Sequence, residues 1–551
     1  MSVSLPIGWL QHAPVLSVLL PLFTAVTLLL MGDRRVGVSE STATRNDAPM
    51  RWQRRISLGS SVLGLVMAVA LVLQAATGEL RVYRLGDWPA PFGIVMVVDR
   101  LSALMVLLSY LVAVPALGYA AAGWDRRGRF FHALFQFQLM GLVGAFLTGD
   151  LFNLFVFFEV LLIASYVLLL HGHGRERLRM GLHYVVLNLV ASGLFLIGLS
   201  LVYAATGTLN MADVGQRVGQ LQGDTRRFAE AASAVLLVVF GLKAAMLPLY
   251  FWLPGTYAAA SAPVAALFAI MTKVGVYSIV RVHWQVFGAG LGAAAPSVVD
   301  WLLPLALATS ALGVLGALAA HSLGRLVAYL TVASVGTILA GVGLFTPGAL
   351  SAALYYTLHS TLVIAGLFLL VELIAAQRGE VGDRLQPAFA VREPVLLGGM
   401  LLFGAASAAG LPPLPGFLGK LMVLQASSGL ATQVGPAQFP VPALLVAADD
   451  GRKTGCVGGC GMAEHLPGIV HLRAFEPAGA GHAVFGQHGA PGRGRLQVEE
   501  LPDGFPVRAD IGHRPVPQGL VVGELQATLG AQPLLVAADL GQEGCCHGRS
   551  A

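Results

Sequence analysis

The stretch VLLVVFGLKAAMLPLYFWLPGTYAAASAPVAALFAIMTKVGVYSIVR (residues 235–281) decides the fold. It places Lys243 and Lys273 inside two apolar segments that are each long enough to cross a bilayer. A lysine at that depth costs roughly 3 kcal/mol or more, so it usually indicates an ion or proton path. Pro248 predicts an interruption in the first of the two helices, because a proline frees a backbone carbonyl that protein or water must satisfy. Pro254 is expected to end that segment.

The second helix is expected to begin at Ser261, a capping residue, followed by a first-turn proline, Pro263. From Pro263 to Lys273 is ten residues. At about 1.5 Å per residue, the Lys273 ammonium would lie about 15 Å from the helix start. That depth corresponds to the middle of a membrane.

Lysine is rare in this chain. Of 34 basic residues only four are lysine, namely Lys243, Lys273, Lys420 and Lys453, and the first three lie in apolar segments. Arginine stays charged, whereas a buried lysine can become neutral, so this usage indicates groups that gain and lose protons. The alternative is that these lysines lie at helix ends and extend to the membrane interface.

Composition excludes an ordinary soluble protein, because 56% of residues are hydrophobic and 11% are charged. No basic residue precedes the first apolar run at 15–32, so we expect a retained helix rather than a cleaved signal. All four cysteines follow residue 447, so thiolate-bound iron chemistry is excluded from the membrane body. The part before the tail carries 26 basic and 18 acidic residues, an excess that we attribute to membrane topology.

Apolar runs predict about twelve membrane helices in an all-α protein. Sixteen arginines follow the odd-numbered segments and six follow the even-numbered ones, which places the N-terminus outside the cell. The predicted segments are 15–32, 57–76, 100–122, 131–149, 151–170, 182–204, 231–253, 262–282, 302–320, 324–345, 350–375 and 394–430, the last interrupted.

Glu159 is predicted to lie about 13 Å into the fifth segment, nine residues after Asp150. A carboxylate at that depth needs a cation, and Lys243 is the expected partner. Together the two form a candidate proton switch: proximity keeps the lysine charged, and separation favours release of its proton. A purely structural ion pair is the alternative. The adjacent acid and base Asp99 and Arg100 are expected to be structural.

His359 lies in an apolar span beside threonine and serine residues, so it can relay protons or simply be satisfied by neighbouring helices. Lys420 follows GLPPLPGFLG (residues 410–419), which predicts a second broken helix. Two interrupted helices in corresponding halves are typical of an inverted-repeat transporter with an ion site near the midplane. His171, His173 and His183 are expected to be solvated rather than metal ligands, and no metal or cofactor is predicted.

Several long motifs carry a family resemblance: LTGDLFNLFVFFEVLLIASY, GLHYVVLNLV, GTLNMADV, FGLKAAMLPLYFWLP, AAASAPVAALFAIMTKVGVYSIVR and YYTLHSTLVIAGLF. They resemble the antiporter-type membrane subunits of respiratory complex I and of the multisubunit Mrp sodium/proton antiporters, most closely the D-type Mrp subunit. The resemblance covers nearly all of residues 10–445. It implies about fourteen helices, two inverted five-helix repeats, and breaks in helices seven and twelve.

The resemblance also implies roles for individual residues. Glu159 matches the family's fifth-helix glutamate, Lys243 the seventh-helix lysine, Lys273 the eighth-helix lysine and Lys420 the twelfth-helix lysine. His359 falls in the eleventh-helix stretch, where some relatives have a further lysine. The expected divisions are N-terminal helices in 1–130, a first repeat in 131–282, a second and truncated repeat in 302–445, and a non-membrane tail in 447–551.

The tail departs from the family pattern, which would continue with two more helices. It contains Cys456 and Cys460 but no apolar run of spanning length. A fragment also recurs, as PALLVAADDG at 442–451 and QPLLVAADLG at 532–541. A reading-frame shift near residue 445 is the preferred interpretation, and a lineage-specific soluble tail is the alternative.

Together these features predict a proton-translocating subunit of a multisubunit Na⁺/H⁺ antiporter in the plasma membrane, with other antiporter subunits as partners and no nucleic acid. It is a secondary transporter subunit rather than an enzyme. Two alternatives stay open. One is a proton-pumping subunit of a quinone reductase or membrane hydrogenase. The other is a scaffold that assembles such a complex without transporting ions.

Overall fold

The computed structural model describes residues 11–32, 48–89, 91–172, 174–288, 296–387 and 391–434, together with five short strands between 485 and 537. The chain divides into two units, Met1–Gly458 and Gly459–Ala551. Within the second unit, β3 (Phe485–Gly486) pairs with β4 (Gln497–Val498), and a separate antiparallel sheet has the order β5-β6-β7 (Arg508–Ala509, Val522–Gln526, Leu534–Ala537). The four cysteines and the predicted frame shift lie outside the described residues.

The first unit begins with α1 (Ala13–Leu30) and α2 (Ala48–Ala76), which lead into a hairpin of β1 (Arg81–Arg84) and β2 (Val95–Val98) with the single turn η3 (Leu85–Asp87) between them. Helix α3 (Arg100–Ala120) starts in a capping box, in which the Asp99 carboxylate accepts from the Ser102 backbone N–H at 2.8 Å. A short turn, η4 (Trp124–Arg126), then leads to α4 (Phe131–Leu147).

The middle of the unit contains the elements formed by residues 235–281 and those that precede them. Their order is α5 (Leu151–Leu170), α6 (Arg175–Thr206), the short α7 (Met211–Val218), α8 (Gly223–Ala244), α9 (Trp252–Ala259), α10 (Ala262–Ile279) and the π-helical turn η5 (Val280–Val286). The α4–α5 junction is Thr148-Gly149-Asp150, where Asp150 accepts from the Asn153 backbone N–H at 2.8 Å and begins α5.

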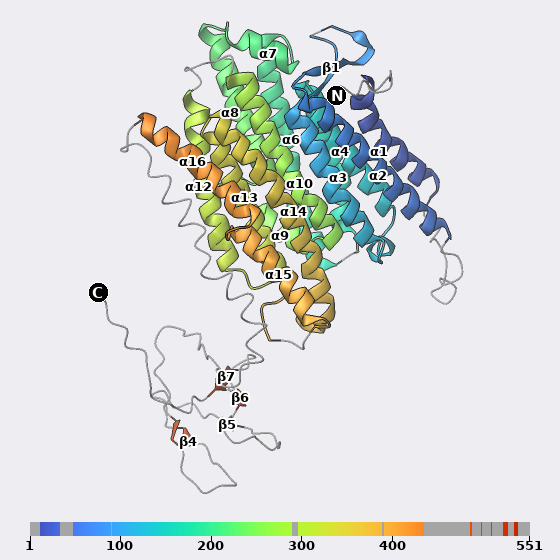
Figure 1. Cartoon of the computed structure of the whole chain (residues 1–551), viewed down its shortest axis with the longest axis vertical. Coiled ribbons are helices and arrows are strands. Elements are labelled where there is room, and N and C mark those ends of the chain that lie inside the picture. The colour runs from blue at the N-terminus through green and yellow to red at the C-terminus, as the bar shows by residue number, and fades with distance from the viewer. Residues whose placement is uncertain are drawn as a thin grey trace. The chain divides into compact units, whose positions relative to one another are not determined.

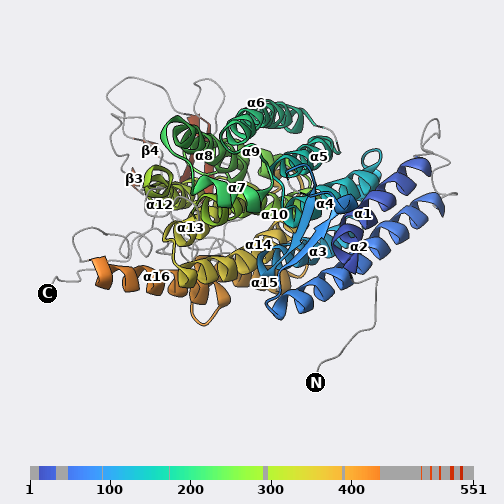
Figure 2. The same cartoon turned by 90° about the horizontal axis from the view of Figure 1, so that it is seen from above.

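The last part of the unit holds α12 (Pro296–Leu318), α13 (Leu323–Gly343), α14 (Pro347–Gln377), the turn η7 (Gly379–Val381), α15 (Pro394–Ala409) and α16 (Pro415–Val434). The helices run side by side in one bundle (Figure 1). Seen from above, α10 and α14 lie between the α1–α2 pair and the α12 and α16 helices (Figure 2).

Nine helices in the described part of the chain are long and apolar enough to cross a membrane, and α4 and α15 are shorter apolar helices. The all-α membrane fold is therefore confirmed, while the twelve-segment count, the inverted repeats and the domain boundaries stay predictions. Two interruptions are present where prolines predicted them, at 245–251 and 410–414. The expectation for Pro254 was wrong: it lies in the first turn of α9, where its missing N–H costs nothing.

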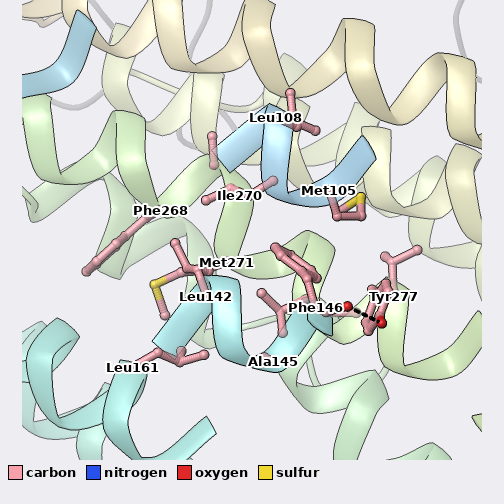
Figure 3. Packing of buried hydrophobic residues seen from close by; sticks show 14 of the residues in the cluster. Met105, Leu108, Leu142, Ala145, Phe146, Leu161, Phe268, Ile270, Met271 and Tyr277 are labelled. Carbon is pink, nitrogen blue, oxygen red and sulfur yellow. Dashed lines mark hydrogen bonds between the residues drawn. The ribbon is translucent and has the colours of Figure 1, made fainter. Parts of the chain in front are cut away.

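Helix α10 forms the centre of the bundle. Every residue from Ala262 to Ile279 is buried, and the helix packs against α3, α4, α8, α13 and α14. Phe268, Ile270 and Met271 lie among apolar side chains of the neighbouring helices (Figure 3). A helix that is apolar on all sides is normally buried in protein or lipid, and here protein surrounds it. Its lysine, Lys273, is therefore shielded from lipid by neighbouring helices.

Candidate functional site

The first helix break positions Lys243. Helix α8 ends at Ala244, and Ala245 takes a left-handed conformation with φ of 59°, so Lys243 lies in the last turn before the break. Its side chain is 6% exposed, and Nζ donates to the Asn188 amide oxygen at 3.0 Å. The Leu242 carbonyl at this helix end accepts from the Trp252 indole N–H at 3.0 Å. The same carbonyl accepts from the Ala245 backbone N–H at 3.0 Å, so the indole is its second donor at the break.

Glu159 lies on α5 and accepts a hydrogen bond from the Ser192 hydroxyl. It does not form the predicted direct ion pair with Lys243; the lysine bonds to Asn188 instead. Asn188 and Ser192 are four residues apart on α6, so they share one helix face. The electrostatic interaction between Glu159 and Lys243 is present, but α6 supplies the neutral group that each of them contacts directly. The two hydrogen bonds, Ser192 to Glu159 and Lys243 to Asn188, thus lie one turn apart on α6, and we call these four residues the polar file.

Lys273 lies at the middle of α10 and is fully buried. Among the described residues, its Nζ has no hydrogen-bond partner. A buried ammonium without a partner is strongly destabilising, and such groups are retained where protein function requires a charge or a proton inside the membrane.

The second break positions Lys420. Helix α15 ends at Ala409, Gly410 follows with φ of 84°, and α16 begins at Pro415. The Lys420 Nζ reaches back across the break and donates to the carbonyl oxygens of Ala408 at 3.1 Å and Ala409 at 2.9 Å. The last carbonyls of a helix carry partial negative charge, so the ammonium is well placed there.

His359 lies on α14, half-buried beside the same break. Its Nε2 is 3.1 Å from the Ser407 carbonyl oxygen, which can only accept, so Nε2 is the donor. Gly416 permits this approach, because a Cβ at that position would lie 2.0 Å from the Ser407 oxygen and 2.8 Å from His359 Nε2. The structure therefore brings His359 and Lys420 together, as the relay hypothesis requires.

A cavity of about 230 Å³ opens between α12, α13, α14 and the second break. That volume accommodates several water molecules. Besides apolar groups, its lining includes Ser310, Ser334, Thr337, His359, Ser360 and Lys420. We call it the hydroxyl cavity.

Glu372 is a polar residue that sequence reasoning missed. Its Oε2 accepts from the Ala262 backbone N–H, the first of α10, at 3.0 Å. Ser261 is the N-cap residue, as predicted, but its side chain does not cap the helix, and its hydroxyl has no partner among the described residues. A carboxylate from α14 therefore stabilises the start of the helix that carries Lys273. The available signal was a single glutamate in the apolar run LVIAGLFLLVELIAA (residues 362–376).

Asp99 forms an ion pair with Arg281 of η5, the turn that follows α10, and not with the adjacent Arg100. The two side chains meet at 2.5 and 2.7 Å, and the Arg281 Nε also donates to the Tyr277 hydroxyl at 2.8 Å. Burial raises the pKa of Asp99, but the hydrogen bonds and charge of Arg281 outweigh it and hold that pKa below its usual range. The Tyr277 hydroxyl donates to the Phe146 carbonyl at 2.6 Å (Figure 3). These contacts connect α10 to α3 and α4, and a structural role for Asp99 stays a prediction.

A second charged cluster lies at the loop after α3. The Asp125 carboxylate is bonded by Arg54 of α2 at 2.5 and 2.7 Å and lies 3.1 Å from His132 Nε2 of α4. Burial raises the pKa of Asp125, yet hydrogen bonds and charge from His132 and Arg54 lower it to about 2. This cluster joins three separate elements.

The predicted loop histidines have different environments. His171 is buried, which corrects the prediction, and its Nε2 lies 2.9 Å from the Trp124 carbonyl oxygen. His183 is exposed and contacts the Phe251 ring, and His173 lies outside the described residues. Where the structure describes side chains, no group of three or more metal-ligating residues occurs.

The bundle and its buried lysines define a multi-pass membrane transport protein. Residues 148–438 match the family model described as NADH:quinone oxidoreductase/Mrp antiporter, TM, and the chain belongs to that family. A relative in Rhizobium meliloti (strain 1021), the D-type subunit of a probable K(+)/H(+) antiporter, is 44% identical over 80% of this chain and 84% of its own length. The D-type subunit of the Na(+)/H(+) antiporter of Bacillus subtilis (strain 168) is 39% identical over 75% and 80%.

Two solved structures have the same fold. One, from the Mrp complex of Dietzia sp. DQ12-45-1b, has a TM-score of 0.67 at 30% identity and covers 82% of this chain and 79% of the matched chain. The other, from respiratory complex I of Thermus thermophilus, has a TM-score of 0.65 at 22% identity, with coverage of 85% and 91%, and it supports the fold alone. The family resemblance predicted from the motifs is confirmed.

Proposed function

We propose that this chain is a D-type subunit of a multisubunit monovalent cation/H⁺ antiporter and that protons pass through it along its buried lysines. The observation that carries the proposal is Lys273, an ammonium without a hydrogen-bond partner among the described residues, on a helix that other helices enclose. A structural lysine would be paired, whereas a proton carrier must be able to lose its charge. Lys243 and Lys420 stand beside the two helix breaks, where water can reach the interior.

In this proposal the polar file from Glu159 to Lys243 controls the first proton transfer. The Glu159 carboxylate stabilises the Lys243 cation through Ser192 and Asn188 on α6. If α5 moves relative to α6, the ammonium is left with less compensation in a medium of low dielectric, and the proton leaves. Lys273 and His359 then pass the proton towards Lys420.

The exchanged cation is inferred from the names of the relatives. The Bacillus subtilis relative is named for Na⁺/H⁺ exchange and the Rhizobium meliloti relative for K⁺/H⁺ exchange, so either monovalent cation fits. We infer a location in the bacterial plasma membrane, the other antiporter subunits as partners, and an external N-terminus from the arginine distribution.

The test uses inside-out vesicles from an antiporter-deficient host that expresses this chain with its complete set of partner subunits. The measured signal is the collapse of ΔpH on addition of sodium or potassium. Lys243→Ala should abolish the signal. Lys243→Arg should abolish it as well, because a guanidinium keeps a charge and can bond to Asn188 but does not release its proton.

Native gel electrophoresis of the same vesicles reports whether the mutant complex assembles. An assembled Lys243→Arg complex with unchanged exchange would place the proton path in another subunit and leave this chain a scaffold. The family also includes subunits of quinone oxidoreductases. Co-purification of a redox subunit with this chain would favour the proton-pump alternative instead.

A further inference from the structure

We propose that the hydroxyl cavity binds the exchanged monovalent cation, Na⁺ or K⁺, and that this cation competes with the Lys420 ammonium for the carbonyl oxygens of Ala408 and Ala409. The inference rests on the proposed function and adds the location of the second ion. It makes the second helix break the place where a proton and a metal cation exclude one another.

The two carbonyls form a cation site that the ammonium already occupies. They are the last of α15, where helix geometry leaves carbonyls without intrahelical partners. Lys420 Nζ contacts them at 3.1 and 2.9 Å. Carbonyl oxygens at the C-terminal end of a broken helix are suitable ligands for a hard monovalent cation, because they combine oxygen ligation with partial negative charge.

The hydroxyls of the cavity present acceptors. Three of them donate to backbone carbonyl oxygens of their own helices: Thr337 to Ala333 at 3.1 Å, Ser334 to Thr331 at 2.7 Å, and Ser360 to Thr357 at 3.4 Å. The hydroxyls of Ser334 and Ser360 thus give their hydrogens to their own helices and keep oxygen lone pairs for another group. Thr337 Oγ1 also lies 3.4 Å from the Ser310 hydroxyl and is hydrogen-bonded to Tyr356, so its oxygen belongs to a connected set of hydroxyl groups at the cavity wall. Such oxygens favour a cation or a water that hydrates it, and disfavour an anion.

The charge of the cavity also fits a monovalent ion. Besides Lys420, the titratable groups in the described lining of the cavity are His359 and Tyr356, both from α14, and the described lining from α12, α13 and α15 contains none. No aspartate or glutamate lines the cavity in the part of the chain described. Without a carboxylate, a divalent ion lacks the charge that normally holds it.

Competition couples the two ions one for one. When Lys420 releases its proton, the neutral amine no longer compensates the two carbonyls, and a cation takes its place with the same single charge. When the proton returns, the ammonium displaces the cation. The net charge of the site stays constant, so neither state leaves a second uncompensated charge in the membrane interior.

The test measures the half-saturating concentrations of Na⁺ and K⁺ in the vesicle assay with the complete complex. Thr337→Val removes one cavity oxygen at nearly constant volume. Thr331→Val is the matched control on the same helix, since Thr331 also donates to the carbonyl four residues earlier, at 3.0 Å, but does not line the cavity. We expect Thr337→Val to raise the half-saturating concentration about five-fold, the effect of one lost ligand contact, and Thr331→Val to leave it unchanged.

The wild-type complex supplies a second measurement that needs no substitution. Lower pH should raise the half-saturating cation concentration while the maximal rate at saturating cation is retained, with choline as the inert control ion. If Thr337→Val does not assemble, Ser360→Ala replaces it, with Ser351→Ala on the exposed face of α14 as control.

Two outcomes separate the proposals. Loss of exchange in Lys243→Ala together with equal cation affinity in Thr337→Val and Thr331→Val would overturn the cation site and leave the proton path standing. Unchanged exchange in assembled Lys243→Ala would overturn the proposed function itself. A maximal rate that falls as the pH is lowered, and that a higher cation concentration does not restore, would also contradict competition.

Discussion

The two helix breaks satisfy their backbone in opposite ways. At the first, Lys243 precedes the break and bonds to the Asn188 side chain, while the Trp252 indole takes the helix-end carbonyl of Leu242. At the second, Lys420 follows the break and takes the carbonyls itself. The first lysine is therefore independent of the backbone and responds to the polar file, whereas the second couples its protonation to the helix end. The first break is therefore suited to controlling proton transfer, and the second to exchanging a proton for a metal cation.

The largest expected effects come from removing a buried lysine, and at the second break that lysine is Lys420. Lys420→Met should reduce exchange by roughly 100-fold or more, since a proton-transfer group is lost. The thermal stability of the purified complex should change little, because water or the cation in the hydroxyl cavity can bond to the carbonyls of Ala408 and Ala409. Vesicle exchange and thermal unfolding of the complex check both parts. A large loss of stability with full exchange in the surviving complex would make Lys420 a structural cap.

The second prediction concerns the polar file at the first break. Asn188→Leu keeps the side-chain size but removes the acceptor of the Lys243 ammonium, and a hydrogen bond to a charged group is worth about 1.5–3 kcal/mol. We expect exchange in the vesicle assay to fall by roughly ten-fold or more.

The matched control for the polar file is Asn188→Asp, which retains an acceptor at the same place and should preserve more exchange than Asn188→Leu. Equal losses in both variants would show that the Asn188 oxygen does not act on Lys243. The half-saturating cation concentration should stay the same in both, since the cation site lies at the other break.

A third prediction separates the stability of the first helix break from ion transport. Trp252→Phe replaces the indole with a smaller aromatic ring and removes the indole donor of the Leu242 carbonyl, which keeps its bond from the Ala245 N–H. The lost hydrogen bond should cost about 0.5–1.5 kcal/mol of stability. Exchange per assembled complex should persist, because the lysine at this break does not depend on that carbonyl. Thermal unfolding and vesicle exchange measure the two effects. Loss of exchange at unchanged stability would contradict the contrast between the breaks.

Much of this arrangement could be predicted from the sequence. Apolar runs located the helices, prolines located both breaks, and the rarity of lysine identified Lys243, Lys273 and Lys420, because each of these signals is local in the chain. The contacts of Glu159 and Lys420 could not be predicted. A buried charged side chain can contact an opposite charge or a neutral group. Which one it contacts depends on which face of a third helix lies between the two charges, and the packing of the whole bundle sets that face.

The smallest effect on exchange is expected from the Asp125 cluster, which lies on elements that form neither break. The pKa of Asp125 is about 2, below the ordinary aspartate value of about 3.9. Because folding depresses this pKa, the cluster contributes stability above about pH 4 and loses it as the pH falls towards 2, by about 2–3 kcal/mol in all. Asp125→Asn should therefore lower thermal stability at neutral pH and flatten its decline between pH 4 and pH 2, while exchange per assembled complex is unchanged. A shift in cation affinity in this variant would mean that the contrast between the two breaks depends on the α2–α4 region as well.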